Sequence, residues 1–208
     1  MPEPLLDHLA LATHDLDTTV AEFTTATGVQ PVEGGRHVGR GTRNYLVGFG
    51  PTSYLEIIGP DVERPVEPGA MPFGLGELTG SRLGTWAVHP RDLESAVAAA
   101  AANGCDLGAI QSMSRTTPAG DTLSWRLTMI DPAPYDGIVP FLIDWGESRH
   151  PAASGLPTVE LVDFTATHPQ PDAVNAVLHA LGLDLPVDRG EAALTATVAG
   201  PAGSYQLR

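Results

Sequence analysis

The sequence repeats one structural unit about every 77 residues, and this repeat limits the possible folds more than any other feature. Three amphipathic helical segments each follow a short apolar segment and an Asp or Pro that signals a helix start. Each of them ends at a glycine, Gly28, Gly104 or Gly182, and these glycines lie 76 and 78 residues apart. Glycine commonly ends a helix because it adopts the left-handed conformation easily. The sequence therefore predicts a chain of repeated modules.

Strand-like segments follow the first two helices, three in each case, and Gly, Pro and Asp turns separate them. Each of these modules is then β-α-β-β-β, which is an α+β arrangement. We expect the modules at residues 5–60 and 83–146 to form one domain over residues 1–150. The third module is shorter, with "ALTATVAG" and "SYQLR" as its clear strands after the helix. Residues 158–208 are expected to pack on the first domain as an abbreviated βαβ-type module.

Charge and composition exclude several classes of function. The 11 basic residues are all arginine and stand against 25 acidic residues, which gives a net charge of −14. A surface this acidic repels nucleic acids and anionic membranes, so we expect neither as a partner. Without lysine there can be no Schiff base, no pyridoxal-phosphate anchor and no P-loop lysine, and we expect no nucleotide. The segment "MPEPLLDHLA" lacks the features of a signal peptide, which predicts a cytoplasmic protein.

Four stretches of the sequence resemble the vicinal oxygen chelate superfamily, whose module is β-α-β-β-β. "LLDHLALATHDLD" is similar to the first strand of such a module and "SYLEIIGPD" to the fourth. "GGRHVGRGTRNYLVGFG" and "PFLIDWGESRHPA" are similar to its bacterial glyoxalase-like branch. The resemblance covers residues 5–150 well and the C-terminal part weakly. It implies a half-open barrel of two modules, in which ligands from the first and fourth strands of each module converge on a divalent metal.

His8 and Glu56 stand at the ligand positions of the first module. Imidazole nitrogen and carboxylate oxygen are ligands that Zn, Ni, Mn or Fe accept, and a carboxylate on an apolar strand needs a cation or hydrogen-bond donors to offset its loss of water. The resemblance therefore implies that both residues face the barrel, bind the metal and take part in catalysis. Two alternatives remain open, because Glu56 could point to solvent or accept a hydrogen bond from an arginine.

The second module departs from this pattern. Alignment of the two modules places Thr85 opposite His8 and Ile143 opposite Glu56, and neither Thr nor Ile is a good metal ligand. A bulge in the strand or an approach from a strand end would be needed to bring in a replacement. The candidates for such a replacement are Asp144, His89 and His150. We therefore expect an incomplete metal site.

Further candidates lie in the Gly-rich stretch after the first helix. Arg36, Arg40 and Arg43 could bind a substrate carboxylate or phosphate, although surface ion pairs explain them equally well. His37 could bind substrate or act as a general base, or it could be a loop histidine in water. Asn44 could orient a polar group of the ligand, or it could belong to the turn into the next strand.

Two tryptophans of the second module complete the set of candidates. Trp125 and Trp145 lie in segments whose strands should line the barrel. Aromatic side chains in such a place can form the wall of a site for an apolar ligand. Packing in the core of the barrel is the competing interpretation.

Two functions are consistent with these residues. The first is an enzyme of lyase or isomerase type, in which Glu56 moves a proton next to a carbonyl group of a small polar substrate while His8 positions a metal or the substrate oxygen. The second is a metal-free protein that sequesters a small hydrophobic compound, as drug-resistance members of the superfamily do. The missing ligands of the second module and the two tryptophans favour the second. The expected partner in both is a small molecule, and the sequence leaves a homodimer open.

Overall fold

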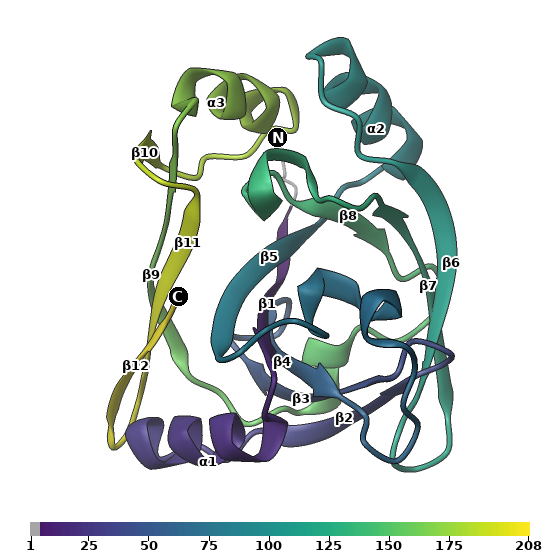
Figure 1. Cartoon of the computed structure of the whole chain (residues 1–208), viewed down its shortest axis with the longest axis vertical. Helices are drawn as coiled ribbons and strands as arrows, with labels where there is room; N and C mark the ends of the chain where they lie inside the picture. The colour runs from purple at the N-terminus through teal and green to yellow at the C-terminus, as the bar shows by residue number, and fades with distance from the viewer. Residues whose placement is uncertain (1–4) are drawn as a thin grey trace.

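The computed structural model describes residues 5–208 and shows a barrel with a separate sheet packed on its outer face (Figure 1). The first module consists of β1 (Leu5–Thr13), α1 (Leu16–Thr27), β2 (Val32–His37), β3 (Thr42–Gly48) and β4 (Tyr54–Pro60). The second consists of β5 (Ser81–His89), α2 (Leu93–Ala102), β6 (Ala109–Thr116), β7 (Thr122–Met129) and β8 (Phe141–Asp144). The third consists of β9 (Glu160–His168), α3 (Pro171–Ala180), β10 (Val187–Arg189), β11 (Ala193–Gly200) and β12 (Gly203–Leu207). Short 3-10 helices lie in the connections: η1 (Pro68–Ala70), η2 (Pro72–Gly74), η3 (Pro134–Gly137) and η4 (Pro151–Ser154).

The predicted barrel of two β-α-β-β-β modules is confirmed. Its strands run in the order β1-β4-β3-β2-β6-β7-β8-β5. β1 and β5 join the two modules along an antiparallel seam that spans nearly the whole of both strands. The second seam is short, with Arg36 opposite Thr116 and His37 opposite Arg115. These two residue pairs bring β2 and β6 together, so the barrel, which the sequence predicts to be half-open, is closed at this edge.

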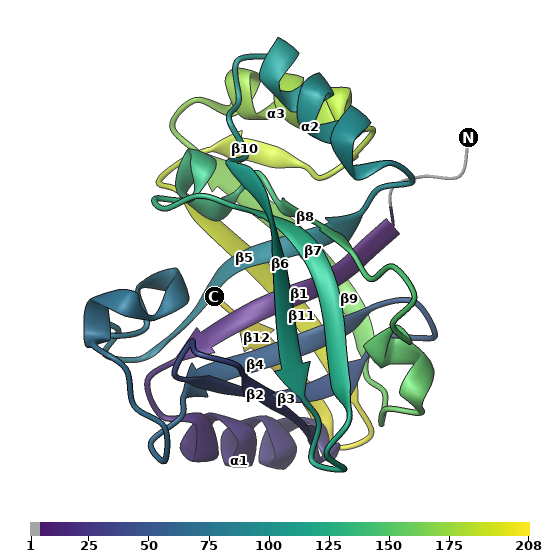
Figure 2. The ribbon, with the colours of Figure 1, turned by 90° about the vertical axis from the view of Figure 1, so that its right-hand side faces the viewer.

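The repeat is also visible in how the helices begin and end. Asp15 caps α1 by accepting a hydrogen bond from the backbone N–H of Thr18 at 3.0 Å, and Gly28 follows the helix at a φ of +73°. Asp92 caps α2 in the same way. Figure 2 shows α2 and α3 side by side at one end of the molecule and α1 at the other. Within residues 5–208, no helix has both the length and the apolar character needed to cross a membrane.

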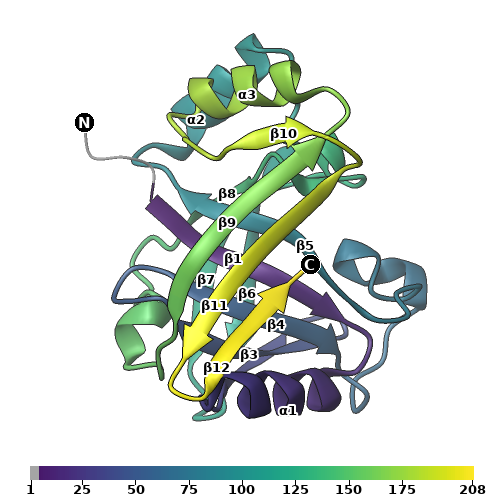
Figure 3. The same cartoon turned by 90° about the vertical axis from the view of Figure 1, so that its left-hand side faces the viewer.

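The third module forms a sheet of its own, in the order β10-β9-β11-β12. Figure 3 shows this sheet lying across β1 and β5. The module has the five elements of the others in short form, since β10 has three residues. Its strand pairing differs. In the third module the first strand, β9, pairs with the second and third strands, β10 and β11, whereas in the first module the first strand, β1, pairs with the fourth strand, β4. The third module thus covers the outside of the barrel and does not extend its wall.

Apolar clusters lie on both sides of the barrel wall, and β4 contributes to both sides. Leu55 and Ile57 point outward into the core that the barrel shares with the third module. Tyr54, Glu56 and Ile58 point inward, because side chains alternate between the two faces of a strand. A strand that is buried on both faces has to be apolar almost throughout. Glu56 is therefore an exception in β4, a carboxylate that lies on the buried inner face of an otherwise apolar strand.

Candidate functional site

His8 and Glu56 face each other inside the barrel. In the parallel pair of β1 and β4, His8 lies opposite Tyr54 and Ala10 opposite Glu56, so these side chains share the inner face. His8 Nε2 lies 3.7 Å from Glu56 Oε2. His8 is 4% exposed and Glu56 is 7% exposed. The structure therefore makes Glu56 a buried carboxylate that points inward, not toward solvent.

Asp7 holds the other nitrogen of the His8 ring. A bulge in the pairing of β1 with β5 just before His8 leaves Asp7 1% exposed. Asp7 Oδ1 lies 2.7 Å from His8 Nδ1, while Oδ2 accepts from Trp145 Nε1 at 2.9 Å and lies 3.1 Å from His150 Nε2. Burial alone would raise the pKa of Asp7, but the hydrogen bonds of His150 and His8 outweigh it and lower the pKa. An ionised Asp7 can only accept, so His8 carries its proton on Nδ1 and turns Nε2 toward Glu56.

Asn44 and His37 approach the other oxygen of Glu56. Asn44 Nδ2 donates a hydrogen bond to Oε1, and His37 Nε2 lies 3.6 Å from the same oxygen. His37 Nδ1 lies 3.0 Å from Thr42 Oγ1, which holds the orientation of the ring. Burial lowers the pKa of His37, which favours the neutral imidazole at neutral pH. Side chains from β1, β2 and β3 therefore surround the carboxylate of β4.

Arg115 reaches this group from the second module, and the sequence interpretation did not include it. Arg115 lies on β6, is 3% exposed and pairs with His37 across the short seam. Its Nη1 lies 3.4 Å from Asn44 Oδ1, so Asn44 bridges Arg115 and Glu56. A Cβ atom at Gly34 would overlap both Asn44 Oδ1 and Arg115 Nη1, so this position needs glycine. We name five residues the inner polar cluster: His8, His37, Asn44, Glu56 and Arg115.

The arginines of the Gly-rich stretch do not gather around Glu56. Arg36 pairs with Asp61 and Glu63, and Arg43 pairs with Glu33 at 3.3 Å. Each of these two arginines is the chain neighbour of an inward-facing residue of the inner polar cluster, so strand alternation turns it outward. Their ion pairs therefore lie on the outside of the barrel wall.

The two tryptophans are neighbours in the inner core, with ring centroids 5.1 Å apart. Trp145 donates its N–H to Asp7 and so helps to hold the partner of His8. Trp125 lies edge-on to His37, with ring centroids 6.2 Å apart. The Nε1 of Trp125 is buried, and within the described part of the chain it has no hydrogen-bond partner. Trp125 therefore brings an unsatisfied donor next to the inner polar cluster.

The candidate metal ligands of the second module are engaged elsewhere. Asp144 accepts a hydrogen bond from Arg126 at 2.7 Å. His89 and His150 lie 3.9 and 3.1 Å from Asp7 Oδ2. Across residues 5–208, no group of three or more His, Cys, Asp or Glu side chains is arranged to hold a metal ion. The donors do not fit the divalent metal that the resemblance implies, and we derive no step that uses one.

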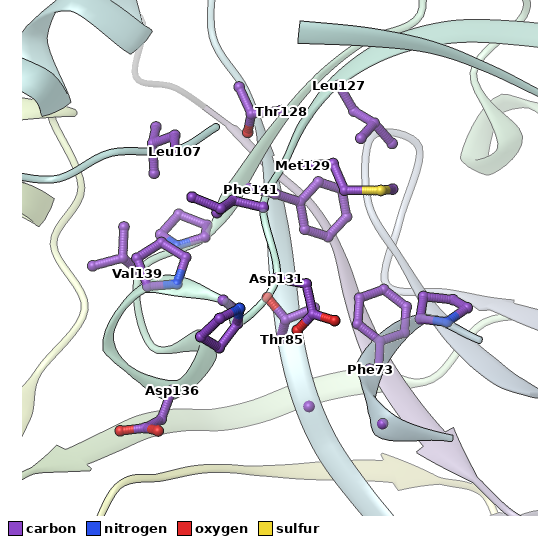
Figure 4. Close-up of a pocket in the computed structure, with 18 of the residues that line it drawn as sticks. Phe73, Thr85, Leu107, Leu127, Thr128, Met129, Asp131, Asp136, Val139 and Phe141 are labelled. Carbon is purple, nitrogen blue, oxygen red and sulfur yellow. The ribbon is translucent and has the colours of Figure 1, made fainter. Parts of the chain in front are cut away.

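A cavity of about 430 Å³ lies at the mouth of the barrel (Figure 4). We name it the mouth cavity. The segment of η1 and η2 and the connection between β7 and β8 enclose it, and Phe73, Leu127 and Met129 contribute to its largely apolar lining. Arg40 also lines it, so this arginine of the Gly-rich stretch lies where a ligand could reach it.

The mouth cavity lies next to the inner polar cluster, although neither His8 nor Glu56 is among the residues that line it. Phe141 forms part of the cavity wall and contacts the His8 ring edge-on, with centroids 5.4 Å apart. Thr85, another lining residue, lies opposite Ala10 on β1, and Ala10 lies opposite Glu56. The cavity wall therefore contacts His8 through Phe141, and Thr85 of the wall lies two strands away from Glu56 in the sheet.

A profile of the family described as "Glyoxalase-like domain" matches residues 6–182. The chain belongs to this family. The matched range of the glyoxalase-like protein covers both barrel modules and continues through β9 and α3. The resemblance to the vicinal oxygen chelate superfamily is thereby confirmed. A comparison with curated proteins gives no significant match.

Solved structures similar to the glyoxalase-like protein share its fold at low sequence identity. A hypothetical protein from Staphylococcus aureus is 14% identical with a TM-score of 0.65, over 98% of this chain and 85% of that one. A mutant 4-hydroxymandelate synthase from Streptomyces coelicolor is 13% identical with a TM-score of 0.50, over 99% of this chain and 62% of that one. A methylmalonyl-CoA epimerase from Mycobacterium tuberculosis is 18% identical with a TM-score of 0.42, over 69% and 89%. The first two support the fold alone.

Proposed function

We propose that the glyoxalase-like protein is an enzyme of lyase or isomerase type that acts on a small polar substrate. In this proposal, Glu56 moves a proton on the carbon next to a carbonyl group of the substrate. The observation that carries it is a carboxylate that is 7% exposed inside an apolar barrel, with two imidazoles and an amide as its neighbours. Because a site without bulk water strengthens electrostatic interactions, such a carboxylate is well placed to act on a bound substrate.

The two oxygens of Glu56 have different surroundings. Oε1 accepts the hydrogen bond of Asn44, which holds the carboxylate in place. Oε2 faces His8 Nε2 at 3.7 Å, which is longer than an N–H···O hydrogen bond. A substrate C–H group that approaches Oε2 therefore has no strong hydrogen bond to displace. We assign Oε2 as the atom that takes the proton.

His8 is placed to act on the carbonyl oxygen. Since Asp7 holds the proton on Nδ1, His8 exchanges protons at Nε2. As Glu56 takes the proton from carbon, the electron pair of that bond moves into the carbonyl group, and a proton on His8 Nε2, donated to the enolate oxygen, stabilises the negative charge there. Return of the proton to another position gives isomerisation, whereas loss of a group from the neighbouring carbon gives elimination.

Hydrogen exchange in D₂O, followed by NMR, tests this proposal. We expect the wild-type protein to accelerate exchange next to the carbonyl group in a panel that includes pyruvate and hydroxyacetone. Glu56→Gln keeps the shape of the side chain but cannot take a proton, so the rate should fall at least about 100-fold. Glu160→Gln, on an exposed position of β9, is the matched control and should exchange as the wild type does. Equal exchange by wild type and Glu56→Gln would refute the role of Glu56.

The mouth cavity favours a second function, the binding of a small hydrophobic compound. Its volume of about 430 Å³ and its largely apolar lining are typical of ligand pockets. If the protein only binds such compounds, the wild type and Glu56→Gln should bind apolar ligands equally well. The protein would also exchange no proton of the compounds in the panel.

A further inference from the structure

We propose that Arg115 is an anion-binding residue that holds the carboxylate of a small oxo acid at the inner polar cluster. Its place on β6 means that both modules contribute to the site, with Glu56 from the first and the anion-binding group from the second. The choice of an oxo acid rests on the function proposed above. The binding of an anion by Arg115 rests on the surroundings of its guanidinium group.

Arg115 has no carboxylate partner among residues 5–208, where no Asp or Glu oxygen lies within 4.0 Å of its guanidinium nitrogens. The more exposed Arg36 and Arg126 each pair with two carboxylates. A cation that is 3% exposed and contacts no carboxylate directly lowers stability, because it loses water without gaining a direct ion pair. An anionic ligand would form that ion pair.

The hydrogen-bond donors around this position are also in excess. A guanidinium group carries five N–H donors, and the structure gives Nη1 of Arg115 one partner, Asn44 Oδ1 at 3.4 Å. Trp125 adds a buried Nε1 donor without a partner, as described above. Both residues adjoin His37, Arg115 through the short seam and Trp125 through its ring. Donors of this kind fit a group that only accepts hydrogen bonds, which a carboxylate does.

The distance between Arg115 and Glu56 selects a short ligand. One side-chain amide, that of Asn44, separates the guanidinium from the Glu56 carboxylate. Gly34 leaves the space in which Asn44 and Arg115 meet. A ligand with its carboxylate on Arg115 would therefore present a carbon to Glu56 only a few atoms away. A small oxo acid has this geometry, because its carbonyl group adjoins the carboxylate.

Binding of pyruvate and of its neutral methyl ester, measured by NMR titration, tests the proposal. Arg115→Met removes the charge and keeps an unbranched, flexible side chain that can fill much of the same space. We expect the affinity for pyruvate to fall at least about 10-fold, because a charge-assisted hydrogen bond is lost, while the affinity for methyl pyruvate stays the same. Arg43→Met, on the outer side of the wall, is the matched control and should bind both compounds as the wild type does.

Two further variants make the outcome decisive. Asn44→Asp places a carboxylate beside Arg115, which should compete with pyruvate and weaken its binding. This variant tests the proposal if Arg115→Met does not fold. Glu56→Gln should keep pyruvate binding, so loss of hydrogen exchange with binding intact separates the function of Glu56 from the anion site. The proposal is overturned if the wild type does not bind pyruvate, if Arg115→Met binds it unchanged, or if both compounds weaken equally.

Discussion

Asp7→Asn should be the most informative substitution outside the inner polar cluster, because Asp7 is 1% exposed and faces three donors. Asparagine keeps one accepting oxygen and places an NH₂ group where the second oxygen was. The new NH₂ group then faces the N–H of Trp145 or of a histidine, so at least one of these donors loses its acceptor. Breaking a buried charged pair from one side costs about 3–5 kcal/mol, and we expect a loss of this size at pH 7.

The pH dependence identifies the cause of this loss. The pKa of Asp7 is lowered in the folded protein from its ordinary 3.8. Its contribution to stability is therefore complete above pH 3.8 and is lost as the pH falls below that value and through the folded pKa. Urea unfolding followed by circular dichroism at pH 7, 5, 4 and 3 should show the free-energy difference between wild type and Asp7→Asn shrinking below about pH 4.

Asp163→Asn provides the control, since Asp163 is an exposed carboxylate on β9. Its free energy of unfolding should stay within about 0.5 kcal/mol of the wild type at every pH. A difference between wild type and Asp7→Asn that does not change between pH 7 and pH 3 would refute the reasoning, because Asp7 would then not be ionised in the folded protein.

Two more predictions follow from the geometry of the site. Gly34→Ala should lower the free energy of unfolding by about 1–3 kcal/mol and weaken pyruvate binding, because the new Cβ overlaps Asn44 and Arg115. Gly69→Ala is the control and should have neither effect, because no atom lies within 4 Å of its Cβ. Protein purified without chelators should contain well below one equivalent of Zn, Ni, Mn or Fe by elemental analysis, and a full equivalent would contradict the conclusion drawn from the donors.

The sequence predicted the parts of the site that depend on the order of strands within one module. His8 and Glu56 occupy the first and fourth strands, and these strands are neighbours in both modules of the barrel. Strand alternation could also have separated Arg43 from Asn44, since adjacent residues of a strand face opposite sides. The interpretation of the arginines as one cluster overlooked this alternation.

The sequence could not reveal the parts of the site that depend on contacts between modules. Arg115 meets Asn44 only because the short seam joins β2 to β6, and two backbone pairs leave no local pattern in either strand. Asp7 is buried through a bulge in the pairing with β5, and the tryptophan that donates to it lies 138 residues away. Contacts of such long range depend on the whole topology and not on local sequence periodicity.

The order of synthesis gives the third module a further importance. Leu9 and Leu11 of β1 are synthesised before the third module, but their outward side chains belong to the core that β9, β11 and β12 complete. The backbone carbonyl of Arg208 accepts a hydrogen bond from the N–H of Leu83 on β5, so even this residue helps to hold the barrel wall. A nascent chain that stalls before β9 therefore exposes a broad apolar surface. Chaperones bind such surfaces, and other unfinished chains aggregate with them. The core on the outer side of the barrel wall is therefore complete only after the third module has been synthesised.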